Sequence, residues 1–105
     1  MTEKRKPTYD LAAFKAACDD VEKLNATTTA IRTAGALGFT RADIVATIQT
    51  MRGSHFHKSM TSYGDHRSWQ DVYFVPSEAG MLYVKFTADA VTEFRLLSFK
   101  GEGDG

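Results

Sequence analysis

The sequence has little cysteine and no excess of charge of either sign. Its one cysteine, Cys18, cannot form an internal disulfide or build a thiolate metal site alone. The 13 Lys and Arg residues balance the 13 Asp and Glu residues, so the formal net charge is zero. This balance argues against a protein that finds nucleic acid through a broad positive field, but it allows a local cationic cleft.

Long apolar runs are also missing. No segment approaches the roughly 20 apolar residues that span a bilayer, and no apolar stretch follows the charged start MTEKRKPTYD as it would in a secretory signal. We therefore expect a protein of the reducing cytoplasm that does not associate with membranes. The length suits one domain, which we assign to residues 1–100, and the tail GEGDG, residues 101–105, is expected to be flexible.

The hydrophobic period changes near Gly53. Before it, apolar residues recur every three or four positions, as in helices, and after it they follow the alternation of strands. A run of helices followed by a run of strands predicts an α+β domain. We expect the N-terminal helices to pack on a C-terminal antiparallel sheet of about four strands.

The first helix is expected to begin after Pro7, with Thr8 as its N-cap. Its apolar stripe recurs at spacings of three and four residues and comprises Leu11, Phe14, Cys18 and Val21. A place in this stripe favours an inert, packed role for Cys18 over a reactive thiol.

Two further helices are predicted before Gly53, which is expected to close the second of them. The earlier one follows the cap-rich segment 25–29 and ends before Gly38, which fits the position just past a helix end. The later one starts at Thr40, and Asp43 completes a weak capping box. Their apolar residues are Ile31, Ala34 and Leu37 in one, and Ile44, Val45, Ile48 and Met51 in the other.

Four strands are predicted after the helices, at about 55–62, 68–75, 81–88 and 93–100. Their connections are hairpin-sized, so a consecutive antiparallel meander is the economical topology. Pro76 is expected to end the second strand because it cannot donate to a ladder, and a short turn around Asp89 joins the last two strands.

Side chains alternate along a strand, so Leu82, Val84 and Phe86 should face the helices. Tyr83 and Lys85 should then face outward. These outward positions are where polar chemistry can be exposed on the sheet.

By the same alternation, Lys58 shares a face with Phe56 and Met60, which is an apolar place for a lysine. Lys58 either belongs to an edge strand, with its ammonium reaching water, or lies near a partly desolvated cleft where its charge counts for more. Gln70 is placed on one face with Val72.

Three histidines lie close together at His55, His57 and His66. Two of them are suited to divide general base and general acid work, since histidine titrates near neutrality. Alternatively, the His55-x-His57 pair with Asp65 and His66 would ligate a metal. Surface or structural roles are the simplest interpretation, because neither spacing is diagnostic.

RNA cleavage without a metal requires an aligned 2′-hydroxyl, stabilisation of the phosphorane charge and a proton for the 5′-oxygen. Lysines, a phenol and an amide can supply the last two. Suitable residues occur on the four predicted strands, namely Lys58, Gln70, Tyr83 and Lys100. Each of them taken singly is equally well explained as a solvated sheet residue.

Residues 56–73, FHKSMTSYGDHRSWQDVY, resemble the corresponding segment of the MqsR family of motility quorum-sensing regulator toxins. The pattern KSMTxYxDHxxWQDVY is long and of mixed composition. The resemblance continues through EKRKPTYDL, LGF, LYVKFT and the terminal LLSFK, and so covers most of the chain.

The resemblance implies a RelE-like fold and a type II toxin that cuts messenger RNA independently of the ribosome. From the candidate residues themselves we expect this cleavage to need no metal or other cofactor. The resemblance also implies a preference for GC-containing triplets such as GCU, and an MqsA antitoxin partner with zinc-binding and helix-turn-helix domains. The family residues implicated in activity correspond to Lys58, Gln70, Tyr83 and Lys100. Candidates for further RNA contacts are His57, His66, Trp69 and Lys85, although a structural role is favoured for His66 and Trp69.

The chain departs from the family pattern at two places. His57 stands where the family has a tyrosine, and Phe74-Val75-Pro76 replaces an arginine-proline. Loss of the arginine predicts weaker or less salt-dependent RNA binding. Both changes bear on triplet preference, since His57 and Phe74 are expected near the bases.

Two other functions compete with the ribonuclease. One is a module that binds an antitoxin or nucleic acid without catalysis, which the changes at His57 and Phe74 favour. The other is a metal-dependent nuclease, which would lose activity in a chelator.

Overall fold

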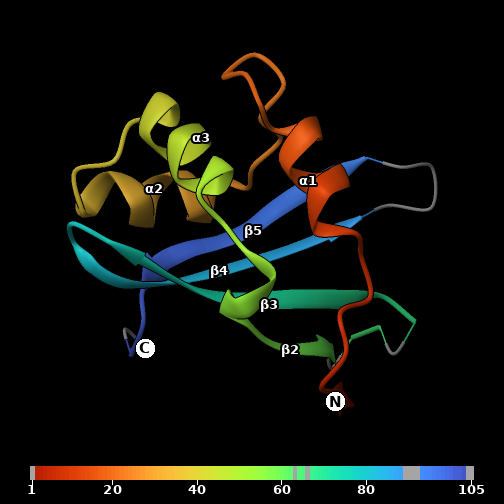
Figure 1. Cartoon of the computed structure of the whole chain (residues 1–105). Helices are drawn as coiled ribbons and strands as arrows, with labels where there is room; N and C mark the ends of the chain where they lie inside the picture. Colours follow the sequence, from red (N-terminus) through yellow and green to blue (C-terminus); the bar gives the residue numbers. More distant parts are fainter. Residues whose placement is uncertain (1, 63, 66, 89–92, 104–105) are drawn as a thin grey trace.

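In the part of the chain that the structure describes, three helices lie on one face of a single antiparallel sheet (Figure 1). The computed structural model describes residues 2–62, 64–65, 67–88 and 93–103. The helices are α1 (Leu11–Ala17), α2 (Thr28–Ala36) and α3 (Arg41–Gln49), with a 3-10 turn at Gly53–His55. The strands are β1 (Glu3–Lys4), β2 (Phe56–Thr61), β3 (Trp69–Ser77), β4 (Gly80–Ala88) and β5 (Phe94–Gly101).

The predicted α+β class is confirmed, but the predicted number of strands was wrong. The sheet has five strands in the order β1-β2-β3-β4-β5, each antiparallel to its neighbour. The extra strand, β1, pairs Glu3 with Met60 and Lys4 with Ser59. A strand of two residues is too short to show alternation, so no pattern in the sequence indicated β1. Its pairing partner, β2, lies far along the chain. The turn predicted around Asp89 lies outside the described residues. The RelE-like fold stays a prediction.

Helix α1 starts later than its sequence predicts. Asp10 is the N-cap and accepts from the amide of Ala12, whereas Thr8 was expected in that role. Cys18 follows the helix as its C-cap and is buried, as predicted. Val21 lies beyond the helix and is 38% exposed, so its predicted place in the core stripe was wrong.

The later helices begin and end largely as predicted. Gly38, just past α2, has a φ of 88°, a conformation that favours glycine. At the start of α3 the predicted capping box is present, with the side chains of Thr40 and Asp43 each accepting from the other's amide. Helix α3 ends at Gln49, so Gly53 does not close it and instead begins the 3-10 turn.

The core lies between the helices and the sheet. Phe14 of α1 stacks on Phe86 of β4 with ring centroids 3.7 Å apart. Leu82, Val84 and Phe86 are fully buried on this face, as alternation predicts. Among the α3 residues expected in the core, Ile44 and Ile48 are fully buried, whereas Val45 is half-buried and packs at its border.

Strand β3 continues through Pro76, contrary to prediction. Its pairing with β2 extends only from Tyr73 to Trp69, so past Tyr73 it pairs with β4 alone. Half of the backbone positions there have no strand partner, and a missing N–H is tolerated at such a position. At the other end of the sheet, Gly101, which we assigned to the tail, belongs to β5, and the amide of Glu102 donates to the oxygen of Met81.

A buried carboxylate joins the N-terminal segment to the sheet. Asp71 of β3 is fully buried and accepts from the amide of Thr8 at 3.1 Å and from that of Tyr9 at 2.9 Å. The hydroxyl of Thr8 lies 2.7 Å from that of Ser59 on β2. Thr8 is therefore engaged by the sheet, which explains why the cap of α1 falls at Asp10.

Asp71→Ala should lower the free energy of unfolding by roughly 2–4 kcal/mol, because it leaves two backbone amides without their acceptor. The measurement is urea denaturation followed by circular dichroism. Asp10→Ala is the matched control, since it removes an exposed N-cap that contributes about 1 kcal/mol. A loss for Asp71→Ala no larger than that for Asp10→Ala would contradict the anchoring role.

Candidate functional site

The face of the sheet opposite the helices, here called the open face, carries the candidate residues. Tyr83 and Lys85 alternate with buried core residues of β4 and so lie on this face, as predicted. In the register, Lys58 lies opposite Val72 and Val72 opposite Lys85, which forms one row across three strands. Lys100 lies opposite Tyr83 in a second row.

A β-bulge in β2 decides which way Lys58 points. Phe56 pairs with Tyr73 and Lys58 with Val72, so two steps along β2 match one step along β3, and His57 is the extra residue. The alternation that placed Phe56 and Lys58 on one face is therefore wrong. Phe56 packs against the ring of Tyr73, with centroids 5.4 Å apart, while Lys58 lies on the open face.

Gln70 completes the set of four. It lies opposite Met60 and two residues from Val72, so it belongs to the same face as Lys58. Strands β2, β3, β4 and β5 thus each contribute one of the four sequence-predicted residues to the open face, and all four are half-buried. Half-burial strengthens their electrostatic interactions and still leaves them within reach of a ligand.

The other expected RNA contacts are divided. His57 stacks on Phe74, with ring centroids 4.3 Å apart and planes 19° from parallel. Phe74 in turn lies opposite Tyr83, with centroids 6.1 Å apart. Trp69 alternates to the helix side, where the ammonium of Lys4 lies 4.2 Å from its ring centroid. His66 lies outside the described residues.

The lysines of the open face influence one another. Burial lowers the pKa of Lys85, and the nearby charges of Lys100 and Lys58 lower it further. Burial raises the pKa of Tyr83, which Lys58 partly offsets and Glu3 reinforces. The ammonium of Lys100 lies 5.2 Å from the ring centroid of Tyr83. The cluster is therefore a concentrated positive charge beside a protonated phenol.

One ion pair at this site has no signal in the sequence. Glu3 of β1 accepts from the ammonium of Lys58 at 2.7 Å, and the side chain of Lys58 is 24% exposed against 51% for Glu3. The hydrogen bond and charge of Lys58 lower the pKa of Glu3. The two residues are 55 positions apart, so only the β1–β2 pairing brings them together.

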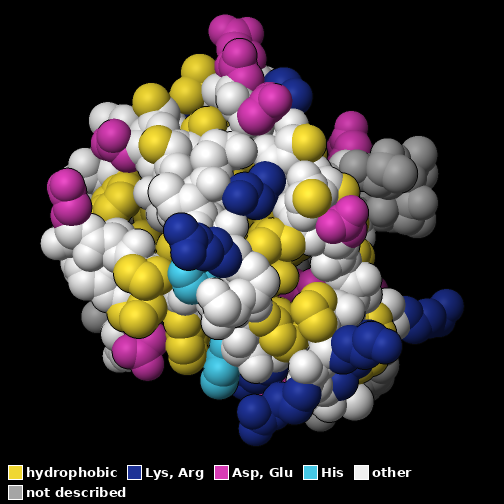
Figure 2. Space-filling view, viewed as in Figure 1, with side chains coloured by type: hydrophobic (Ala, Val, Ile, Leu, Met, Phe, Trp, Pro, Cys, Tyr) yellow, Lys and Arg dark blue, Asp and Glu magenta, His cyan; other side chains and the backbone are white. Residues whose placement is uncertain are grey.

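Charge is unevenly distributed on the side of the molecule that Figure 2 shows. In Figure 2, Lys and Arg side chains gather toward the lower edge, where β2 and the N-terminal segment lie in Figure 1. Asp and Glu side chains lie at the top, the left and the right of this view. The balanced composition is therefore compatible with a local excess of positive charge at the lower edge.

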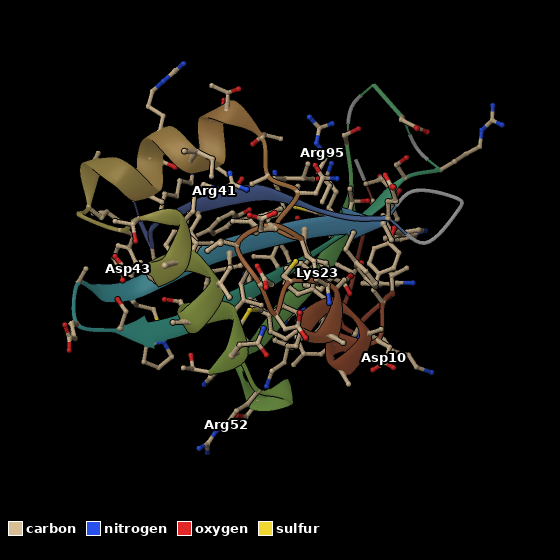
Figure 3. The ribbon with its side chains drawn as sticks, turned by 90° about the horizontal axis from the view of Figure 1, so that it is seen from above. Asp10, Lys23, Arg41, Asp43, Arg52 and Arg95 are labelled. Atoms are coloured by element: carbon tan, nitrogen blue, oxygen red, sulfur yellow. The ribbon has the colours of Figure 1, made fainter. Side chains whose placement is uncertain are left out.

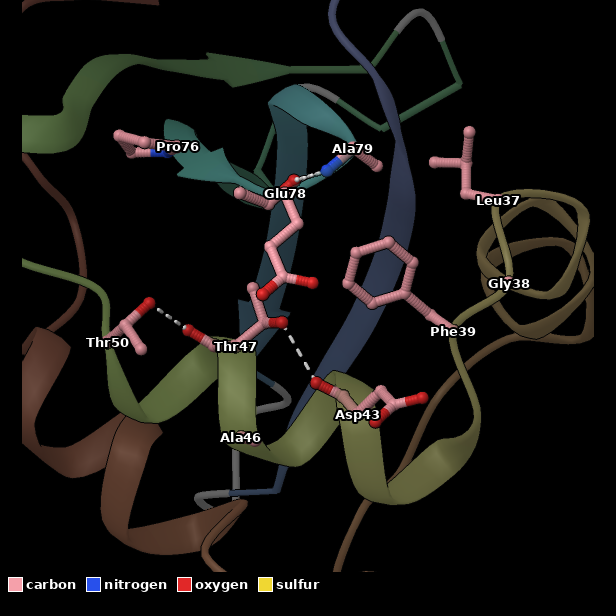
Figure 4. A pocket seen from close by; sticks show the side chains of 11 residues that line it. Leu37, Gly38, Phe39, Asp43, Ala46, Thr47, Thr50, Pro76, Glu78 and Ala79 are labelled. Carbon is pink, nitrogen blue, oxygen red and sulfur yellow. Dashed lines mark hydrogen bonds between the residues drawn. The ribbon is translucent and has the colours of Figure 1, made fainter.

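A separate hollow of about 590 Å³ lies on the helix side, between α3 and the β3–β4 turn (Figure 4). Leu37, Phe39 and Pro76 supply apolar surface, and Asp43 and Glu78 add two carboxylates. These carboxylates oppose an anionic ligand. The hollow is thus unsuited to phosphate, unlike the open face.

The alternative histidine and cysteine chemistries find limited support. The Nδ1 atom of His55 accepts from the amide of Arg52 at 3.0 Å, which engages it in the turn before β2. Within the described ranges, no three His, Cys, Asp or Glu side chains gather as metal ligands would. Burial raises the pKa of the Cys18 thiol to about 11, so it stays protonated at neutral pH.

Two comparisons place the chain among known proteins. A family model described as "Motility quorum-sensing regulator, toxin of MqsA" matches residues 6–101. The mRNA interferase toxin MqsR of Escherichia coli (strain K12) is 34% identical over 98 residues, which cover 93% of this chain and 97% of that protein. No helix in the described part of the chain has the length and apolar character to cross a membrane.

Lys85→Met should raise the thermal midpoint at neutral pH by on the order of a few degrees. Folding lowers the pKa of Lys85, so the unfolded chain binds its proton more readily and the native state is penalised below the folded pKa. The penalty fades as pH rises through the ordinary lysine range. Thermal melts near neutral pH and at about pH 11 should therefore show the gain only at the lower pH.

The exposed Lys6→Met is the matched control and should change the midpoint little at either pH. An equal gain for Lys85→Met at both values of pH would show that lost charge is not its cause.

Proposed function

The chain belongs to the motility quorum-sensing regulator toxin family, and we propose that it is the toxin of a toxin–antitoxin pair that cleaves messenger RNA. The observation that carries the proposal is that Lys58, Gln70, Tyr83 and Lys100 lie on the same open face, in three neighbouring rows of the sheet. The similar Escherichia coli protein is named an mRNA interferase toxin, which supports the same reaction here.

The proposed reaction is attack of a ribose 2′-hydroxyl on the adjacent phosphate, which breaks the bond to the 5′-oxygen and leaves a 2′,3′-cyclic phosphate. Lys58 binds the phosphate and stabilises the phosphorane, and Lys100 adds to the positive potential. Gln70 positions the scissile group through its amide. The separation of these groups onto four strands gives the site a rigid base, since strands hold side chains more firmly than loops.

Proton transfer is assigned to Tyr83 and Lys85. Burial raises the pKa of Tyr83, so its phenol keeps a proton at neutral pH that it can donate to the leaving 5′-oxygen. Burial and two neighbouring lysines lower the pKa of Lys85, so its ammonium loses a proton more readily than that of an ordinary lysine. Lys85 stays mostly charged at neutral pH, and its minor fraction with a free amine accepts the proton of the 2′-hydroxyl.

This mechanism uses no metal, because the lysines supply the charge that a cation would otherwise provide. The stacked pair of His57 and Phe74 lies beside Lys58 and offers an aromatic surface to a base. We also propose the family preference for GC-containing triplets, ribosome independence, an MqsA-like antitoxin with zinc-binding and helix-turn-helix domains, a RelE-like fold and a cytoplasmic location, where messenger RNA is found.

Lys58→Ala should lower the rate of RNA cleavage by roughly 10²–10³-fold, because it removes a positioned charge from the phosphorane. The measurement is single-turnover cleavage of a defined RNA with mapped ends, with and without EDTA. The wild-type rate should be the same in both. Lys6→Ala, an exposed lysine outside β2, is the control and should cleave normally.

Near wild-type cleavage by Lys58→Ala would overturn the assignment of Lys58, and loss of wild-type cleavage in EDTA would favour the metal-dependent nuclease. Absence of cleavage by the wild type, together with absence of growth arrest on expression, would favour the binding module without catalysis.

Glu3→Gln should tighten RNA binding by about two- to five-fold, since it releases Lys58 from an ion pair of the strength usual at a protein surface. The measurement is the Kd for a non-cleavable RNA carrying 2′-O-methyl groups, at low and at moderate salt. Glu22→Gln, an exposed carboxylate after α1, is the control for the loss of one negative charge. Equal gains for the two variants would mean that net charge, and not the pair with Lys58, sets the affinity.

A further inference from the structure

A second hollow, of about 500 Å³, lies at one end of the open face. One of its lining residues is Gln70, which is also a candidate catalytic residue. The β2–β3 connection forms one side of it through Ser62, Asp65 and Ser68. Arg95 and Leu97 of β5 form the other side. Figure 3 shows Arg95 beside the β2–β3 connection. A volume of this order suits a small organic group.

The hollow presents a fixed acceptor in Asp65. Its carboxylate accepts from the amide of Arg67 at 2.9 Å and from the hydroxyl of Ser68 at 2.8 Å. Its own amide donates to the hydroxyl of Ser62 at 3.2 Å. These bonds hold the side chain in one place and lower the pKa of Asp65, so it is ionised at neutral pH. The acceptor is therefore oriented before any ligand arrives.

The charges of the hollow differ from those of the lysine cluster. Its lining contains two carboxylates, those of Asp65 and Glu93, and one guanidinium, that of Arg95. A phosphate would meet repulsion here, whereas it is attracted to Lys58 and its neighbours. The hollow therefore suits an uncharged group that offers both hydrogen-bond donors and acceptors. A nucleobase has this character, and its phosphate would lie at the lysines.

The position of Gln70 gives the distance between the second hollow and the lysines of the open face. Gln70 lines the hollow and lies two residues from Val72, which stands between Lys58 and Lys85 in their row. Two residues of a strand span about 7 Å, so the hollow and the lysines lie within reach of one nucleotide.

We propose that this hollow receives the nucleobase next to the scissile phosphate and that Arg95 and Asp65 select guanine there. Guanine offers an arginine two neighbouring acceptors, O6 and N7, and offers a carboxylate neighbouring donors on N1 and N2. No other base presents both pairs. The inference rests on the proposed ribonuclease function, and it assigns a specificity-determining role to two residues outside the four candidate catalytic positions.

The test is cleavage of short RNAs in which each nucleotide flanking the cut is varied through all four bases. The wild type should favour guanine at one flanking position. Arg95→Gln should lower kcat/KM for that RNA by about 10- to 100-fold and change the others little, so that the preference is lost. Asp65→Asn keeps the size of the side chain and should weaken the same preference. Arg32→Gln, on the exposed surface of α2, should change nothing.

Uniform loss across all RNAs in Arg95→Gln would make Arg95 a phosphate contact and overturn the inference, as would an unchanged guanine preference. A separate readout is the binding of guanosine and cytidine, followed by amide chemical shifts. Guanosine should perturb amides around the hollow in the wild type and not in Arg95→Gln. A chain that binds guanosine there but cleaves no RNA would refute the proposed function alone. A chain that cleaves RNA but binds neither nucleoside there would refute the inference alone.

Discussion

The contact between Asp71 and the backbone of Thr8 and Tyr9 determines how the two halves of the molecule meet. It holds the N-terminal segment against the sheet before α1 begins, which lets β1 pair with β2. It also directs α1 so that Phe14 stacks on Phe86 in the core. A buried carboxylate is costly unless its oxygens are well satisfied, and here two backbone amides supply the donors. This contact places α1 over the sheet, whereas α2 is held by its own hydrogen bonds to β5, such as the one from the hydroxyl of Thr33 to the oxygen of Phe99.

One-sided packing separates structural from chemical residues. The helices cover one face of the sheet, so alternation sends buried apolar side chains of β4 toward them and Tyr83 and Lys85 away. Several lysines then share a half-buried surface, where their charges raise one another's free energy. Such repulsion is unfavourable for stability, and a phosphate would relieve it. The neutral composition of the chain gives no sign of this arrangement, because a total charge does not tell where the charges lie.

Much of the fold could be predicted from local patterns. The capping box at Thr40, the glycine after α2 and the alternation along β4 depend on residues a few positions apart, so each is visible in the sequence. The start of α1 and the passage of β3 through Pro76 could not be predicted, because each depends on contacts with distant strands. The face on which Lys58 lies could not be predicted either, because a bulge reverses the alternation within β2.

The sequence by itself determined the class of the fold, the helices, the alternation that places Tyr83 and Lys85 outward, and the family through its long motif. Only the tertiary structure decided that residues of four strands lie on one face, that Glu3 pairs with Lys58, and that Gln70 lines a second hollow. The physical reason is the separation along the sequence over which each interaction acts. Capping and alternation act between near neighbours, whereas strand register, a bulge and a long-range ion pair arise only when distant segments pack together.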